Sequence, residues 1–256
     1  MRIIIHLCLL VVLFASLPAC AQNINPKRYG YKVEEVFSFD ETAYTQGLFI
    51  YDDLLYLSTG NRGASYLRKI DFRKGRILQS IALAPRYFGE GACVFQDKVY
   101  QLTWEEQTCF VYDAATLKQV GTLPYRGEGW GLTANDTHLI MSDGSSTLYF
   151  RDPNTFAVVR SITVKNGQRE VQWLNELEYI EGEVWANVYT TDEIVRIDPN
   201  TGIVTGIIDL KGLPARQHLT PKTEVLNGIA YDSDKKHIYV TGKYWAKMYR
   251  ISLVPK

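Results

Sequence analysis

Short apolar runs separated by polar turns follow one another along most of the chain, and the pattern repeats. Each unit opens on a two-residue doublet that leads into an apolar strand, a polar turn and a second apolar or aromatic strand. The doublets are Gln46-Gly47, Glu90-Gly91, Trp130-Gly131, Asn175-Glu176 and Asn227-Gly228, and they recur at intervals of 40 to 52 residues. Matched units of this length with almost no helical periodicity predict an antiparallel all-β protein.

A third strand completes the inner part of each unit, and in the first four units it ends at an aspartate. Turn residues such as Pro153-Asn154 and Pro199-Asn200 follow, and a fourth strand then runs outward, as in 76–83 and 158–164. Four strands in each of five units predict a five-bladed β-propeller. The alternative, an open β-sandwich, leaves the five matched doublets unexplained.

The two ends of the chain carry complementary parts of one unit. The fifth repeat stops after its third strand, 248–252, and has no outer strand of its own. The segment from Tyr31 to Phe39 lies upstream of the first doublet and has the pattern of an outer strand. We therefore expect this N-terminal strand to close the last blade, which removes the free edges at the joint.

Residues 1–21 have the pattern of a secretory signal. A short basic start precedes an apolar run that is shorter than the ~20 residues of a bilayer-spanning helix. Leu17, Pro18 and Ala19 before Cys20 resemble a bacterial lipobox, which makes Cys20 the predicted lipidation site; ordinary cleavage before Gln22 is the alternative. We expect an exported protein, periplasmic or anchored by a lipid, with a linker over 22–30 and a single catalytic domain over 31–256.

Charge and cysteine content narrow the function classes. Lys plus Arg equals Asp plus Glu at 28 each, so the chain has no electrostatic footprint for nucleic acid. Cys93 and Cys109 fall in the expected first and third strands of one unit, which favours two buried thiols over a disulfide, although the pairing stays possible. The histidines lack ligand spacing, so we expect no catalytic zinc and no cofactor. We expect a monomer.

Equivalent positions of the five units meet at one end of the central channel of a propeller. One ring consists of the first doublet members, and a second ring stands at the end of each second strand: Gly60, Trp104, Gly144, Tyr189 and Lys243. Packing alone would tend to repeat one residue type around a ring. These rings instead combine one carboxylate, several carboxamides, one ammonium and large aromatic side chains, which is the pattern of a small-ligand pocket.

The same positions resemble a known family. The motifs that carry the resemblance are Thr45-Gln46-Gly47-Leu48, Phe88-Gly89-Glu90-Gly91, Leu102-Thr103-Trp104, Glu128-Gly129-Trp130-Gly131-Leu132, Leu174-Asn175-Glu176-Leu177-Glu178, Val184-Trp185-Ala186-Asn187-Val188-Tyr189, Leu226-Asn227-Gly228-Ile229-Ala230 and Thr241-Gly242-Lys243-Tyr244-Trp245. In this order they resemble the glutaminyl-peptide cyclotransferases of plant and bacterial type. The resemblance covers residues 33–254.

The resemblance implies a five-bladed propeller that converts the N-terminal glutamine of peptides and proteins to pyroglutamate with release of ammonia, an acyltransferase reaction not attributed to a metal. It implies Glu90 as the general acid and base. It implies substrate-holding groups at Gln46, Asn175 and Lys243, to which the ring adds Asn227, and aromatic walls at Tyr44, Phe88, Trp104, Trp130 and Tyr189. Tyr44 and Tyr189 depart from the Phe and Trp expected there, which bears on substrate preference.

Elementary chemistry agrees with this assignment. The α-amine must lose a proton before it attacks the γ-carboxamide, and the departing nitrogen must gain one, so a single carboxyl group can serve as base and then acid. Glu90 is the only acid in the two rings. Burial would raise its pKa and Lys243 would lower it, and the sequence leaves that balance open.

Two other functions remain open at this point. Glu90, Asn175, Asn227 and Asp143 are reminiscent of a Ca²⁺-dependent lactonase on a propeller, although an ammonium at Lys243 would repel the metal. A lipid-anchored propeller could also be a binding module without catalysis. The long insertion at 210–223 is expected to overhang the pocket.

Overall fold

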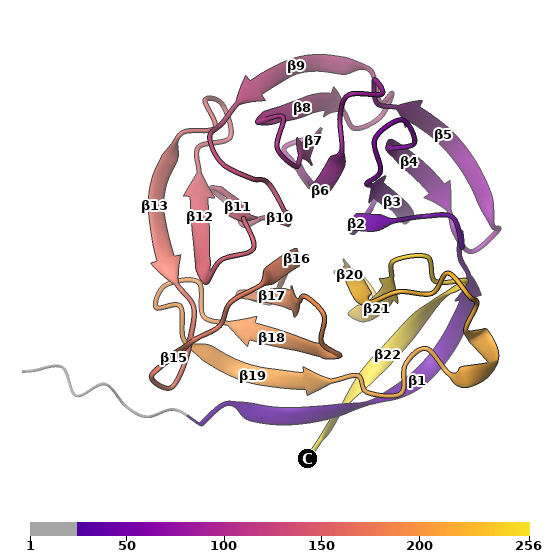
Figure 1. The fold of residues 1–256 in the computed structure, drawn as a ribbon, viewed down its shortest axis with the longest axis vertical. Coiled ribbons are helices and arrows are strands. Elements are labelled where there is room, and N and C mark those ends of the chain that lie inside the picture. Colours follow the sequence, from indigo (N-terminus) through magenta and orange to yellow (C-terminus); the bar gives the residue numbers. More distant parts are fainter. Residues whose placement is uncertain (1–24) are drawn as a thin grey trace, which may run out of the picture.

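The computed structural model describes residues 25–256, in which five four-stranded blades surround a central axis (Figure 1). The predicted five-bladed propeller is therefore confirmed. The predicted signal segment 1–21 and Cys20 lie outside the described residues. Within the part that the structure describes, no helix is long and apolar enough to span a membrane.

The first three blades each follow the chain from the axis outward. Blade 1 contains β2 (Thr45–Tyr51), β3 (Leu54–Thr59), β4 (Tyr66–Asp71) and β5 (Arg76–Ala82). Blade 2 contains β6 (Gly89–Phe95), β7 (Lys98–Thr103), β8 (Thr108–Asp113) and β9 (Gln119–Pro124). Blade 3 contains β10 (Leu132–Ala134), β11 (Leu139–Ser142), β12 (Thr147–Arg151) and β13 (Val158–Thr163).

Blades 4 and 5 share one continuous sheet. A small hairpin of β14 (Lys165–Asn166) and β15 (Arg169–Glu170) precedes blade 4, which contains β16 (Leu174–Ile180), β17 (Glu183–Val188), β18 (Glu193–Ile197) and β19 (Val204–Asp209). After the short 3₁₀ helix η1 (Arg216–His218), blade 5 contains β20 (Leu226–Asp232), β21 (His237–Gly242) and β22 (Lys247–Pro255). Its fourth strand is β1 (Lys27–Ser38).

Strand β1 closes the ring as the sequence predicts. It pairs antiparallel with β22 from Tyr29↔Pro255 to Ser38↔Lys247, so the outer strand of the last blade comes from the N-terminal part of the chain (Figure 1). It also extends further than expected. Lys27–Tyr29 pair in parallel with Gly206–Ile208 of β19, so part of the predicted 22–30 linker is strand.

Turn chemistry explains how the inner hairpins form. The two-residue loops Asp52-Asp53, Gln96-Asp97 and Glu181-Gly182 all have positive φ at both positions. This is the type I′ geometry, whose twist matches that of the flanking strands and which favours Asp, Asn and Gly.

The core is divided among the junctions between blades. Five clusters of buried residues are found in the described chain, each shared by two adjacent blades. Phe49 and Tyr56 of blade 1, for example, pack with Val99 and Phe110 of blade 2. Cys93 and Cys109 are buried free thiols, as expected.

Candidate active site

A β-bulge lies at the start of four of the five innermost strands, where the doublets stand. The register shifts between Thr45 and Gly47 in blade 1 and between Gly89 and Ala92 in blade 2, and blades 4 and 5 have equivalent shifts at their doublets. A bulge leaves a residue out of the ladder and re-aims its side chain. This local irregularity directs Gln46, Glu90 and Asn175 to the end of the channel.

Glycine at the second doublet position allows neighbouring inner strands to approach each other. A Cβ atom on Gly47 would lie 2.5 Å from Ala92 N, and one on Gly131 would lie 2.0 Å from Asn175 O. Neither distance is sterically possible, so only glycine fits. Blade 4 has Glu176 at this position, and its buried carboxylate accepts hydrogen bonds from Leu48 N (3.2 Å) and Ile229 N (2.8 Å) of blades 1 and 5.

The two predicted rings surround a cavity of about 310 Å³. Nine of the ten predicted catalytic and substrate-binding residues line it: Tyr44, Gln46, Phe88, Glu90, Trp104, Trp130, Asn175, Tyr189 and Lys243. The two glycines of the second ring leave room for the aromatic walls. A Cβ on Gly60 would lie 2.3 Å from the Phe88 ring, and one on Gly144 would lie 2.7 Å from the Trp130 ring.

Asn227 is the predicted residue that does not line the cavity. Its Nδ2 donates to Gln46 Oε1 (3.1 Å) and to Thr45 O (2.9 Å), which places it behind Gln46. Gln46 Nε2 in turn donates to Glu90 Oε1 (2.7 Å). The structure thus gives Asn227 a supporting position, in which it orients the amide that holds the Glu90 carboxyl.

Two buried acceptors of the cavity have no hydrogen-bond partner among the described residues. They are Glu90 Oε2 and Asn175 Oδ1. A buried polar atom without a partner costs about 1–3 kcal/mol, so a ligand with N–H donors would gain from pairing with these atoms. The cavity therefore offers two unpaired acceptor atoms of its described residues to a ligand.

Burial dominates the electrostatics of the site. It raises the pKa of Glu90 well above its ordinary value, although Lys243 and the Gln46 hydrogen bond oppose the shift. Burial also lowers the pKa of Lys243 to about 8, against the attraction of Glu90. The ammonium lies 4.3 Å from the centre of the Tyr44 ring and 5.0 Å from that of Tyr189, where cation–π attraction stabilises it. The effect of burial on the pKa of Glu90 is therefore larger than the opposing effect of Lys243, a comparison that the sequence left open.

A third ring, two positions before the first, was not recognised from the sequence as a ring. It comprises Tyr44, Phe88, Glu128, Trp173 and Val225. Glu128 Oε2 accepts from the indole N–H groups of Trp104 (2.7 Å) and Trp130 (2.9 Å), which fixes both walls. Trp173 packs against Trp130 with ring centres 6.2 Å apart and is 56% exposed. The constant two-residue offset is the signal that could have identified both residues.

No described side chain of the insertion at 210–223, which was expected to overhang the cavity, is among the residues that line it. Leu210 and Leu213 are instead buried with Trp245 and Tyr249, and His218 Nδ1 lies 2.7 Å from the Tyr249 hydroxyl. Burial of these apolar side chains against Trp245 and Tyr249 holds the insertion against blade 5.

The residues considered for calcium do not line one cavity. Asn227 lies behind Gln46, and Asp143 lines a different cavity, where its carboxylate accepts hydrogen bonds from Ser145 N and the Tyr149 hydroxyl. In residues 25–256 no group of three or more His, Cys, Asp or Glu side chains is placed to hold a metal ion.

Fold and cavity together define a β-propeller with a desolvated carboxyl group at the end of its central channel. A sequence profile of the glutamine cyclotransferase family matches residues 5–253, and the chain belongs to this family. The chain is 43% identical over 223 residues to a glutaminyl-peptide cyclotransferase of Arabidopsis thaliana, covering 85% of this chain and 69% of that protein. It is also similar to the crystal structure of Myxococcus xanthus glutaminyl cyclase, with a TM-score of 0.84, 32% identity, and coverage of 90% of this chain and 99% of that one.

Proposed function

We propose that the protein is a glutaminyl-peptide cyclotransferase that converts an N-terminal glutamine to pyroglutamate and releases ammonia. The observation that carries the proposal is the buried Glu90 carboxyl group, which has one oxygen held by Gln46 and the other without a partner inside the cavity. Family membership supports the same reaction. An N-terminal glutamine brings an amine and a primary amide, both of which supply N–H donors to such a site.

Glu90 has the position and the proton affinity for both proton transfers. As a carboxylate it takes a proton from the α-amine as the nitrogen attacks the γ-carboxamide carbon. It then returns a proton to the amide nitrogen, so that the carbon–nitrogen bond breaks and ammonia leaves. Burial raises the pKa of Glu90 and so makes its carboxylate a stronger base, and proton transfer of this kind contributes typically ~10²–10⁴-fold.

Lys243 is the best candidate to stabilise the oxyanion that forms on the attacked carbon. Its buried ammonium lines the cavity and forms no ion pair with a carboxylate within the described chain. The amide N–H of Gln46 already donates to Glu90, so Gln46 acts by positioning the base. Asn175 offers its free Oδ1 to the substrate amine or amide.

The aromatic walls keep the substrate folded for an intramolecular attack. The rings of Phe88, Trp104 and Trp130 line the cavity. Phe88 packs edge to face on Trp104, with ring centres 5.6 Å apart. The walls hold the γ-carboxamide against the α-amine and so remove conformational freedom before the reaction. The loss of this freedom is a large part of the barrier in such cyclisations.

We further propose that residues 1–21 direct export and that Cys20 carries a lipid, which would place the propeller at a membrane surface. The basic start, the short apolar run and the lipobox-like 17–20 support this proposal. Metabolic labelling with a radioactive fatty acid should label the wild type and leave Cys20→Ser unlabelled. Release of unlabelled wild-type protein that begins at Gln22 would contradict the lipid anchor.

The activity is tested by incubating the purified protein with a short peptide that begins with glutamine. We expect ammonia in solution and a peptide lighter by one ammonia molecule. A matched peptide that begins with asparagine should not react, because its amide would have to close a strained four-membered ring. Activity should survive a metal chelator, whereas loss of activity that Ca²⁺ restores would favour the lactonase-like site.

A further inference from the structure

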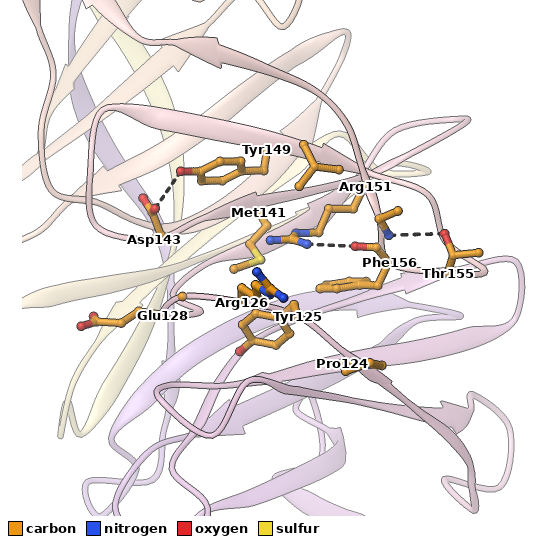
Figure 2. Close-up of a pocket in the computed structure, with 13 residues that line it drawn as sticks. Pro124, Tyr125, Arg126, Glu128, Met141, Asp143, Tyr149, Arg151, Thr155 and Phe156 are labelled. Atoms are coloured by element: carbon orange, nitrogen blue, oxygen red, sulfur yellow. Dashed lines mark hydrogen bonds between the residues drawn. The ribbon is translucent and has the colours of Figure 1, made fainter.

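A second cavity of about 400 Å³ lies between blades 2 and 3 and has no role in the proposed reaction. Its lining comes from the segment after β9, from β11 and β12, and from the turn that follows β12. Figure 2 shows the side chain of Arg151 reaching from β12 into the midst of these residues. One wall is the segment 125–128, whose last residue, Glu128, holds the two active-site tryptophans.

Arg151 interrupts a hydrophobic position of the repeat. The third strand of the first four blades has a bulge just before its final aspartate, and the residue at that bulge is Ile70 in blade 1, Tyr112 in blade 2 and Ile197 in blade 4. Blade 3 has Arg151 at the equivalent bulge. Packing does not require a guanidinium here, because the other three blades use an apolar or aromatic residue.

The Arg151 guanidinium is buried and forms no ion pair with any residue from 25 to 256. The residue is 5% exposed, its Nη1 donates to Phe156 O (2.9 Å), and its Nε has no hydrogen-bond partner among the described residues. Rings of Phe156, Tyr125 and Tyr149 lie 4.8, 5.5 and 5.8 Å from its Cζ. These contacts offset part of the burial cost, but a guanidinium stays charged in proteins and a buried charge is costly unless it is paired.

Neither arginine of the cavity forms an ion pair with a described residue. Arg126, at the exposed mouth, contributes a second guanidinium to the lining. The lining also contains two acids, Asp143 and Glu128, whose hydrogen bonds all go to uncharged groups. Asp143 bonds to Ser145 and Tyr149, and Glu128 bonds to the two tryptophans. No carboxylate of the lining is hydrogen-bonded to either arginine.

We propose that this cavity is a second binding site, which takes a small oxyanion such as a carboxylate or phosphate group on Arg151, with Arg126 at its mouth. The planar guanidinium matches such oxygens, and the unpaired Nε–H is the donor that they would satisfy. The anion has two possible sources. It is either a free ion or a carboxylate of the peptide chain whose first residue occupies the neighbouring active-site cavity.

The free-ion source is tested by titrating inorganic phosphate into the substrate-free protein at constant ionic strength, with binding followed by calorimetry. We expect saturable binding that weakens at least tenfold in Arg151→Met, since a hydrogen bond between two charged groups is among the stronger polar contacts. Arg160→Met is the matched control. Arg160 also lies over an aromatic ring, Phe150, and donates to one carbonyl, Pro199 O, but it does not line the cavity.

The peptide source is tested by comparing glutamine-initiated peptides of increasing length as C-terminal acids and as C-terminal amides. This arm rests on the proposed cyclotransferase activity, whereas phosphate binding needs no turnover, so failure of one proposal does not imply failure of the other. At the peptide length whose C-terminus reaches Arg151, we expect the C-terminal acid to have a KM about tenfold lower than the C-terminal amide. This difference should be present in the wild type and in Arg160→Met and should vanish in Arg151→Met.

Arg126→Gln provides a second variant if Arg151→Met fails to fold, because residue 126 is exposed. It should weaken phosphate binding or the acid preference about threefold. Phosphate binding or an acid preference supports the site if it weakens in these arginine variants. Absence of phosphate binding together with equal kinetics for acids and amides would overturn it, as would responses that Arg151→Met and Arg126→Gln leave unchanged.

Discussion

Glu90 and Lys243 are both shifted toward their neutral forms by the same cavity. Burial raises the pKa of Glu90 well above its ordinary value and lowers the pKa of Lys243 to about 8. Their mutual attraction opposes both shifts and is the smaller effect. A carboxylate whose pKa is raised is a stronger base, and the acid that it becomes can return the proton, as a reaction with one deprotonation and one protonation requires.

The pH profile of kcat tests the role of Lys243. Its positive charge is lost as pH rises through about 8, so kcat should fall above that pH if the ammonium stabilises the oxyanion. Lys243→Met should reduce kcat by about 10²–10³-fold, as loss of one oxyanion donor does. It should also abolish the alkaline fall and move the acidic limb upward, because Lys243 no longer lowers the pKa of Glu90. An unchanged alkaline fall in Lys243→Met would rule out this role.

At the scale of single elements, the innermost strand of blade 4 differs most from the others. Strand β16 carries two buried glutamates near the axis, and burial raises the pKa of both. Glu176 bonds to backbone N–H groups of blades 1 and 5, and Glu178 Oε1 accepts from Tyr231 N (2.9 Å) of blade 5. These carboxyl groups connect blade 4 to blades 1 and 5 through backbone N–H groups of β2 and β20, which are the edge strands of their sheets.

Glu178 should make the stability of the protein depend on pH. Its pKa is about 8 in the folded state, whereas an unfolded glutamate titrates near ~4.3. Between these values the folded state binds more protons, so the free energy of unfolding should decrease as pH rises, by up to about 1.4 kcal/mol per pH unit for one group. Glu178→Gln keeps the acceptor for Tyr231 N and removes the titration.

The measurement is the denaturant midpoint of both proteins at several pH values from weakly acidic to above 8. We expect the wild type to lose stability steadily and Glu178→Gln to lose less, with the two curves diverging most at high pH. Parallel curves would show that Glu178 does not titrate over this range.

The sequence predicts the rings because strand spacing is periodic. Periodic spacing alone cannot show that Asn227 lies behind Gln46 and not on the cavity wall. Asn227 has the spacing of a ring residue, but its amide is already satisfied by Gln46 and Thr45 O. The bulges that aim these side chains also depend on the register between strands, which only the folded sheet defines. Glu128 was missed because it interrupts the aromatic pattern that Tyr44, Phe88 and Trp173 share, and Trp173 because its contact with Trp130 is defined only in the folded structure.

The whole molecule depends on the joint between its first and last strands. The sequence predicts this joint from a missing outer strand in the fifth repeat and an unassigned strand at the other end. The additional parallel pairing of β1 with β19 was not predicted, because three residue pairs at a strand end leave no periodic signal. The predicted disposition of Cys93 and Cys109 holds, since apolar strands surround both thiols.

Two truncations separate the contributions of β1. A chain that begins at Tyr31 loses the pairing with β19 and should unfold a few degrees lower than the full propeller. A chain that begins at Phe39 lacks β1 entirely, exposes the edge of β22, and should aggregate or lose cooperative unfolding. Thermal unfolding and gel filtration check both. A stable monomer without β1 would contradict the closure role.

The most direct test of the whole account is the rate of ammonia release by Glu90→Gln from a peptide that begins with glutamine. This substitution keeps the size of the side chain and its contact with Gln46 but removes the group that accepts and returns the proton. We predict a rate at least about 10²–10⁴-fold below that of the wild type, with a thermal midpoint no lower. A folded Glu90→Gln protein with activity within a few-fold of the wild type would contradict the mechanism.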